Sequence, residues 1–168
     1  MTIQTNLAAG LLTALMTIPA LSTSAAEITR TPNAGNALIL QSATIPAGSE
    51  ILFLSGLTPT PITAGKTDSF EAFGDTKTQT IAVMERIKAA LAEKGYAMSD
   101  VVKMTVFLVG DPKLGGKMDF AGMNDAYKMY FGSAANKNLV TRSTIQVAAL
   151  AAPYYLVEIE ATAAKAPK

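Results

Sequence analysis

The chain has 168 residues, a formal net charge of +1 and 49% hydrophobic residues, which suits one folded domain with no general attraction to nucleic acid. It contains neither cysteine nor histidine, which excludes disulfides, zinc sites of the Cys/His type and every mechanism that needs a histidine base. Acid–base chemistry must therefore use carboxylates, lysine, tyrosine, backbone groups or water.

The first 26 residues carry no charged side chain and contain an apolar run, Leu7–Leu21, followed by small residues that include Ser24 and Ala26. This pattern predicts a cleaved secretory signal over residues 1–26 and a single domain over residues 27–168, exported to the periplasm or the medium. The run is short for a membrane span, and the basic residue usual before such a run is missing. An uncleaved anchor, or an N-terminal arm on a cytoplasmic protein, remain the alternatives.

Hydrophobic periodicity predicts the element order β-β-α-β-α-β-β. A turn at 46–49 is expected to join the first two strands as a hairpin, and residues 27–36 are expected to be an irregular lead-in. Helical spacing with capping residues indicates the two helices. The expected strands are 37–44, 50–55, 99–109 and a final pair within 139–164, and the expected helices are 75–94 and 119–131.

The two helices are expected to cover one face of a mixed sheet, against the apolar side of the strand at 99–109. The other face is expected to mix polar groups with large apolar ones, which favours burial against another copy of the chain. We therefore expect a homo-oligomer whose sheets face each other. The residues predicted for this mixed face are Phe53, Lys103, Thr105, Phe107, Arg142, Thr144, Gln146 and Glu158.

The last two strands alternate strictly, which is typical of strands with one buried side. Arg142 shares one side of its strand with Thr144, and Glu158 shares one side of the next strand with Glu160. If these strands are neighbours, the arginine and the two carboxylates converge on one face. A structural ion pair or a solvated face would produce the same pattern.

Several motifs together resemble the RidA/YjgF family of enamine/imine deaminases. They are ILFLSGLTP, TKTQTIAVMERIKAAL, SDVVKMTVFLVGD, DFAGMNDAYKMYFG and VTRSTIQVAALAAPYYLVEIEATA, in this order. The resemblance implies an α+β, chorismate-mutase-like fold and a homotrimer with a barrel core and active sites between subunits. It also implies hydrolysis of 2-aminoacrylate-like enamines and imines to 2-keto acids and ammonia, with no metal or organic cofactor.

The resemblance also assigns roles to individual residues. Arg142 falls on the arginine that grips the substrate carboxylate, a task that a planar guanidinium suits. Glu158 falls on the carboxylate that positions the attacking water. Asn124 and Ser55 match residues that contact substrate or shape the pocket, and packing or capping would explain either equally well. Thr144 stands where many members have cysteine and is expected to offer polar groups to the substrate.

The chain departs from the family at its N-terminal side. Many deaminases carry Gly-Pro-Tyr-Ser-Gln before the first strand, whereas this chain has Gly35-Asn36-Ala37-Leu38 and no tyrosine before Tyr96. The sequence therefore does not identify the residues of the pocket rim or the preferred substrate.

A non-catalytic module that binds a small carboxylate, or a holdase-like protein, is the alternative on the same fold. Ribonuclease activity, attributed to relatives, is disfavoured without a histidine or a basic stripe, and we expect neither a nucleic-acid partner nor a membrane partner once the signal is removed.

Overall fold

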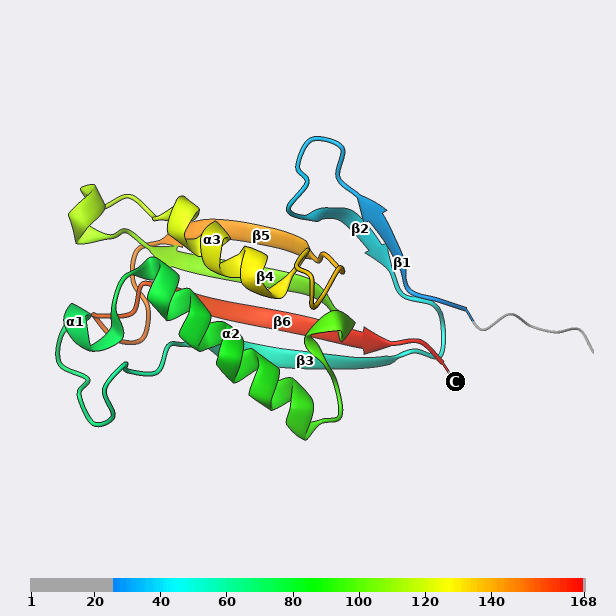
Figure 1. The fold of residues 1–168 in the computed structure, drawn as a ribbon, viewed down its shortest axis with the longest axis horizontal. Coiled ribbons are helices and arrows are strands. Elements are labelled where there is room, and N and C mark those ends of the chain that lie inside the picture. The colour runs from blue at the N-terminus through cyan, green and yellow to red at the C-terminus, as the bar shows by residue number, and fades with distance from the viewer. Residues whose placement is uncertain (1–25, 168) are drawn as a thin grey trace, which may run out of the picture.

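A four-stranded mixed sheet with two helices on one face forms the body of the chain (Figure 1). The structure is a computed structural model that describes residues 26–167, so the expected signal at 1–26 lies almost wholly outside the described residues. The elements in chain order are β1 (Thr29–Pro32), β2 (Leu40–Thr44), β3 (Glu50–Leu57), α1 (Phe70–Phe73), α2 (Thr76–Glu93), β4 (Val101–Val109), α3 (Phe120–Tyr130), β5 (Thr141–Val147) and β6 (Val157–Lys165), with 3-10 turns at Met98–Asp100 and Pro112–Leu114.

The strand order in the main sheet is β3-β6-β4-β5. The β3–β6 and β6–β4 pairs are antiparallel, whereas β4 and β5 are parallel. A parallel pair needs a crossover connection, and α3 provides it on the covered face. The α+β class and the mixed sheet with two helices on one face, both predicted from the sequence, are confirmed.

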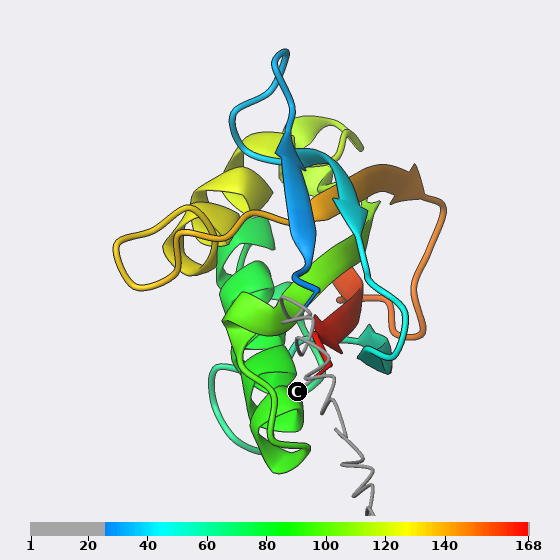
Figure 2. The same cartoon turned by 90° about the vertical axis from the view of Figure 1, so that its right-hand side faces the viewer.

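Both helices bury an apolar stripe against the sheet, and Figure 2 shows them together on one side of it. The Asp75 carboxylate caps α2 by accepting from the Thr78 N–H at 2.8 Å, and Asp119 caps α3 by accepting from the Gly122 N–H at 2.8 Å. Burial of side chains of this size stabilises the fold by about 1.5–3 kcal/mol each. Fully buried core residues include Val83, Met84, Ile87 and Leu91 of α2, Met123 and Tyr127 of α3, and Met104, Val106, Leu108 and Ile159 of the sheet.

The hairpin predicted from strands 37–44 and 50–55 is wrong, because β2 pairs with β1 in a separate two-stranded sheet while β3 pairs with β6. Residues 29–32 lack the apolar alternation of a strand, and polar contacts hold them instead. The guanidinium of Arg30 donates to the carbonyls of Ser99, Val101 and Leu139 at 2.9, 3.0 and 2.9 Å. This clamp fixes β1 at the start of β4 and just before β5.

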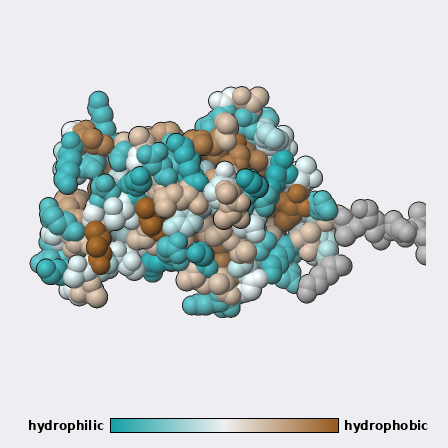
Figure 3. Space-filling view, in the orientation of Figure 1, coloured by the Kyte–Doolittle hydropathy of each residue, from teal (hydrophilic) through white to brown (hydrophobic). Residues whose placement is uncertain are grey.

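The two faces of the main sheet differ in what they expose. Seen from the side of the helices, the surface of the molecule is a mixture of hydrophilic and hydrophobic groups (Figure 3). The open face instead exposes large apolar side chains, with Phe53 at 75%, Ile51 at 47% and Ile145 at 46% of their surface accessible. The expected mixed face therefore exists. Arg142, Thr144 and Gln146 do not belong to it, because their partners on β4 are all buried under the helices.

Between residues 26 and 167, no helix combines the length and the apolar character needed to cross a bilayer.

Gln79 of α2 links the helix to the segment that enters β6. Its side chain is fully buried, its Nε2 donates to the carbonyls of Gly74 and Tyr154 at 3.1 and 3.0 Å, and its Oε1 accepts from the Leu156 N–H at 2.7 Å. We predict that Gln79→Leu lowers the free energy of unfolding by about 3 kcal/mol, because it leaves buried backbone groups unpaired.

Urea denaturation measures this effect. Lys77→Leu, at an exposed position on the same helix, is the matched control and is expected to change stability by less than about 0.5 kcal/mol. Equal stability of the two variants would contradict the role given to the Gln79 amide.

Candidate functional site

Arg142 lies on β5, at the edge of the main sheet, and projects toward the helices. The parallel register pairs Arg142 with Met104 of β4, and paired residues share a face. Met104 is fully buried under the helices. The guanidinium therefore lies beneath α3 rather than on the open face.

Four residues of α3 surround this guanidinium. Its Nη2 donates to Asn124 Oδ1 at 2.7 Å, and its Nη1 lies 3.7 Å from Met123 Sδ. Its central carbon is 4.4 Å from the centre of the Tyr127 ring and 5.9 Å from that of Phe120. Aromatic faces attract cations, so α3 both orients and stabilises the charge.

No carboxylate within residues 26–167 pairs with Arg142, since the ion pairs there join Lys88 to Glu85 and Lys128 to Asp125. Burial lowers the pKa of Arg142 from its usual value, an effect that the nearby Tyr127 opposes. A half-buried cation without an anion is energetically unfavourable, and the hydrogen bonds from its two terminal nitrogens leave further N–H groups for a ligand. This arrangement suits a bound carboxylate, which a guanidinium can hold through two hydrogen bonds.

Glu158 lies at the start of β6 on the open face. The register pairs it with Phe107 of β4, and its carboxylate packs over β3 at Gly56. A Cβ atom on Gly56 would lie 2.9 Å from the Glu158 carboxyl carbon, so the absence of a side chain makes room for the carboxylate. Gly56 belongs to a bulge in the β3–β6 pairing, where Ser55 and Gly56 stand between the pairs Leu54–Ala161 and Leu57–Ile159.

The predicted convergence of Arg142, Glu158 and Glu160 on one sheet face is wrong. β4 lies between β5 and β6, and the registers place Arg142 on the helix-covered face and both glutamates on the open face. Alternation within each strand was predicted correctly. Only the phase of β5 was predicted wrongly, because Arg142 and Thr144 lie under the helices while the apolar Ile145 lies on the open face.

The other predicted site residues divide between the same two faces. Asn124 is 8% exposed and orients Arg142. Thr144 shares its face, but its hydroxyl is buried and finds no partner among the described residues. Ser55 is exposed on the open face, where it lines a hollow of about 260 Å³ together with Lys103, Thr105 and Glu160.

The sequence did not reveal the residues that surround Arg142 or the contacts made by Gln146. Phe120, Met123 and Tyr127 form the walls around Arg142, and Phe120 is 42% exposed. Asn124, a polar residue on the same helix, was the signal available. At the far end of β5, Gln146 fixes the segment before α3 by donating to the Gly116 carbonyl at 2.9 Å and accepting from the Met118 N–H at 3.0 Å.

The described part of the chain, residues 26–167, contains no cluster of three carboxylates placed to hold a metal ion.

Comparison with known proteins identifies relatives of this chain. The profile of the family described as Endoribonuclease L-PSP matches residues 42–165. A RutC family protein of Pyrococcus horikoshii is 37% identical over 139 residues, which cover 83% of this chain and 98% of that protein. TdcF of Escherichia coli, which is provisionally named a reactive intermediate deaminase, is 33% identical over 68% of this chain and 79% of its own length.

Solved structures show the same fold. The crystal structure of Escherichia coli TdcF with bound serine matches with a TM-score of 0.55 at 32% identity, covering 81% of this chain and 94% of TdcF. YyfB of Yersinia pestis, from the Rid protein family, matches with a TM-score of 0.58 at 24% identity, covering 76% of this chain and 87% of its own.

We predict that Arg142 binds short carboxylates. At about 10 mM, 2-oxobutanoate should raise the melting temperature of the parent protein by a few degrees, because a ligand that binds only the folded state stabilises it. Arg142→Gln should abolish this shift, and Lys137→Gln, at an exposed cation, should keep it. Differential scanning fluorimetry measures all three, and an undiminished shift in Arg142→Gln would refute the assignment.

Proposed function

Since this chain belongs to the Endoribonuclease L-PSP family, which includes the RutC and YjgF proteins, we propose that it hydrolyses reactive enamines or imines of 2-aminoacrylate type to 2-oxo acids and ammonia. The observation that carries the proposal is the half-buried guanidinium of Arg142, which no carboxylate of residues 26–167 neutralises. The name of TdcF supports the reaction class, and the serine bound to TdcF supports a small ligand that bears a carboxylate.

The proposed site is formed by two copies of the chain. Arg142 and Glu158 project from opposite faces of one sheet, so one protomer cannot bring both to the same substrate. The exposed Phe53 and Ile145 on the open face support burial against another copy. We propose a homotrimer, as the family resemblance implies, in which Arg142 of one subunit faces Glu158 of the next.

The reaction needs little acid–base help. Arg142 holds the substrate carboxylate and the Glu158 carboxylate accepts a hydrogen bond from water, which aligns the water with the imine carbon. The water oxygen bonds to this carbon and a proton moves to the nitrogen, which gives a tetrahedral amino alcohol. The hydroxyl proton of this intermediate then moves to the nitrogen, the carbon–nitrogen bond breaks, ammonia leaves, and the carbon–oxygen double bond of the 2-oxo acid forms.

A binding module without turnover is the second candidate, and the missing tyrosine before Tyr96 favours it. In that case the carboxylate site at Arg142 would be retained and hydrolysis would be absent. The family description names an endoribonuclease, but this chain has no histidine and a net charge of only +1, which does not favour RNA cleavage.

We further propose that the chain is exported, because residues 1–26 are uncharged and end in small residues. Expression of the full chain in a Gram-negative host, followed by intact-mass measurement of the periplasmic fraction, tests this. A periplasmic chain that begins at Glu27 is expected. A full-length chain found only in the cytoplasm would contradict export.

We predict that Arg142→Ala lowers kcat/KM by about 100-fold or more, since a charge-assisted grip on the carboxylate is lost. Glu158→Gln should lower kcat by a similar factor, whereas Glu160→Gln, on the same strand and face, should stay near the parent value. Imines generated in situ by an amino-acid oxidase serve as substrates, and the surviving imine is trapped with semicarbazide. Turnover by Arg142→Ala at the parent rate would refute the site.

The two inactive variants also test whether the site is shared. When Arg142→Ala and Glu158→Gln are unfolded and refolded together at equal concentration, about a quarter of the sites between subunits should regain both groups. Light scattering of each sample checks that the assemblies are trimeric. A monomeric parent, or a mixture as inactive as its parts, would contradict a site between subunits.

A further inference from the structure

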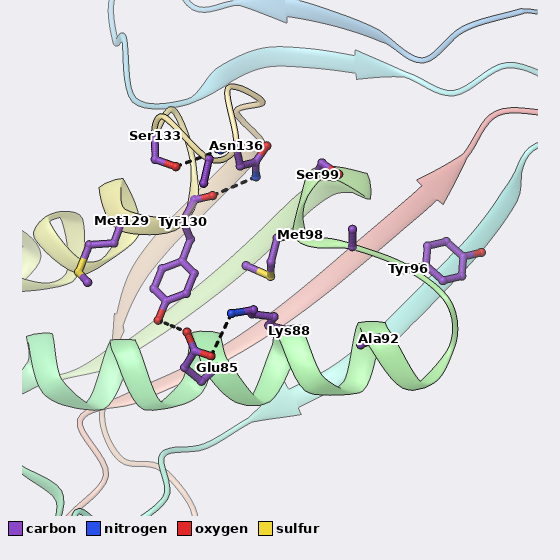
Figure 4. Close-up of a pocket in the computed structure, with 12 residues that line it drawn as sticks. Glu85, Lys88, Ala92, Tyr96, Met98, Ser99, Met129, Tyr130, Ser133 and Asn136 are labelled. Atoms are coloured by element: carbon purple, nitrogen blue, oxygen red, sulfur yellow. Dashed lines mark hydrogen bonds and ion pairs between the residues drawn. The ribbon is translucent and has the colours of Figure 1, made fainter.

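A second cavity lies on the helix side of the sheet, away from the open face. It is open to solvent, its volume is about 580 Å³, and it is lined by the C-terminal halves of α2 and α3 and by the segments at 96–99 and 133–136 (Figure 4). This size is typical of sites for small molecules. Arg142 and Glu158 are not among its lining residues.

The walls of this cavity are mostly apolar. Ala92 of α2, Met98, Met129 and the ring of Tyr130 are among its lining residues, and Met129 is 56% exposed. Methionine side chains adapt to the shape of an apolar group and contact it favourably. The cavity therefore suits an apolar body the size of an aliphatic side chain.

One carboxylate and one ammonium face this cavity, and they come from one turn of α2. Glu85 Oε1 accepts from the Tyr130 hydroxyl at 2.8 Å, while Lys88 Nζ lies 3.4 Å from Glu85 Oε2. Burial, together with Glu85, raises the pKa of Tyr130, so its hydroxyl stays a donor that fixes the carboxylate. The Glu85 and Lys88 side chains are 53% and 59% exposed, and such an ion pair is weak enough for a ligand to open.

The polar groups opposite α2 are already occupied by local bonds. Asn136 donates through Nδ2 to the Tyr130 carbonyl at 2.9 Å and through its backbone N–H to Ser133 Oγ at 3.1 Å. Recognition of a charged ligand therefore falls to Glu85 and Lys88. A ligand with a single charge would place that charge near the residue of the pair that has the same sign. A zwitterion can instead pair with both Glu85 and Lys88.

We propose that this cavity binds a free α-amino acid with an apolar side chain. The ammonium group pairs with Glu85, the carboxylate pairs with Lys88, and the side chain lies over Met98 and Ala92. Binding is reversible and uses no residue of the proposed deaminase site, so the two proposals can fail separately.

Titration of the isotope-labelled full chain with L-leucine, followed by NMR, tests the proposal. Saturable shifts are expected around residues 85–98 and 129–136, with a dissociation constant in the range of about 1 mM. The two single-charge analogues, 4-methylpentanoate and 3-methylbutylamine, should bind about tenfold more weakly, because each pairs with only one partner. Equal binding of all three, or no shift at about 10 mM L-leucine, would overturn the proposal.

Variants locate the binding. Ala92→Phe, at an exposed position, fills the cavity and should abolish the shifts, and Glu85→Gln and Lys88→Gln should each weaken binding about tenfold. Glu93→Gln, an exposed carboxylate of α2 outside the cavity, is the matched control and should bind like the parent. Arg142→Ala should also bind L-leucine normally. Binding that survives Ala92→Phe but disappears in Arg142→Ala would overturn this assignment.

Discussion

The alternation of side chains along a β-strand is the constraint on which the proposed chemistry depends. Because β5 and β6 lie on either side of β4 in fixed register, Arg142 and Glu158 must project from opposite faces of the sheet. No side-chain rotation within one protomer changes this. A site that uses both groups therefore requires a second copy of the chain, and the apolar open face provides a surface on which that copy could pack.

Much of the fold could be predicted from the sequence, because the long helices and strands carry strong periodic patterns. The α2 and α3 helices and the strand β4 lie close to their predicted positions. β1 could not be found in this way, since three hydrogen bonds from Arg30 hold it rather than an apolar face. The helix α1, only four residues long, has no periodicity to detect.

The candidate site could be predicted only in part, and the limit is geometric. The family resemblance assigned a carboxylate grip to Arg142 and the positioning of a water to Glu158. The side that β5 presents to the helices depends on long-range pairing, which its alternation alone does not encode. The wall around Arg142 was also hidden, because Tyr127 and Met123 look the same in a sequence whether they fill a core or flank a cation.

The bulge at Ser55–Gly56 has a consequence for how this chain can evolve. The space above Gly56 is occupied by the carboxylate of Glu158, so any larger residue there displaces that group before it disturbs the core. A survey of folding stability alone would rate this edge strand as permissive to mutation. If Glu158 has the proposed role, selection for turnover would instead keep Gly56 invariant, so function and fold would constrain the same position to different degrees.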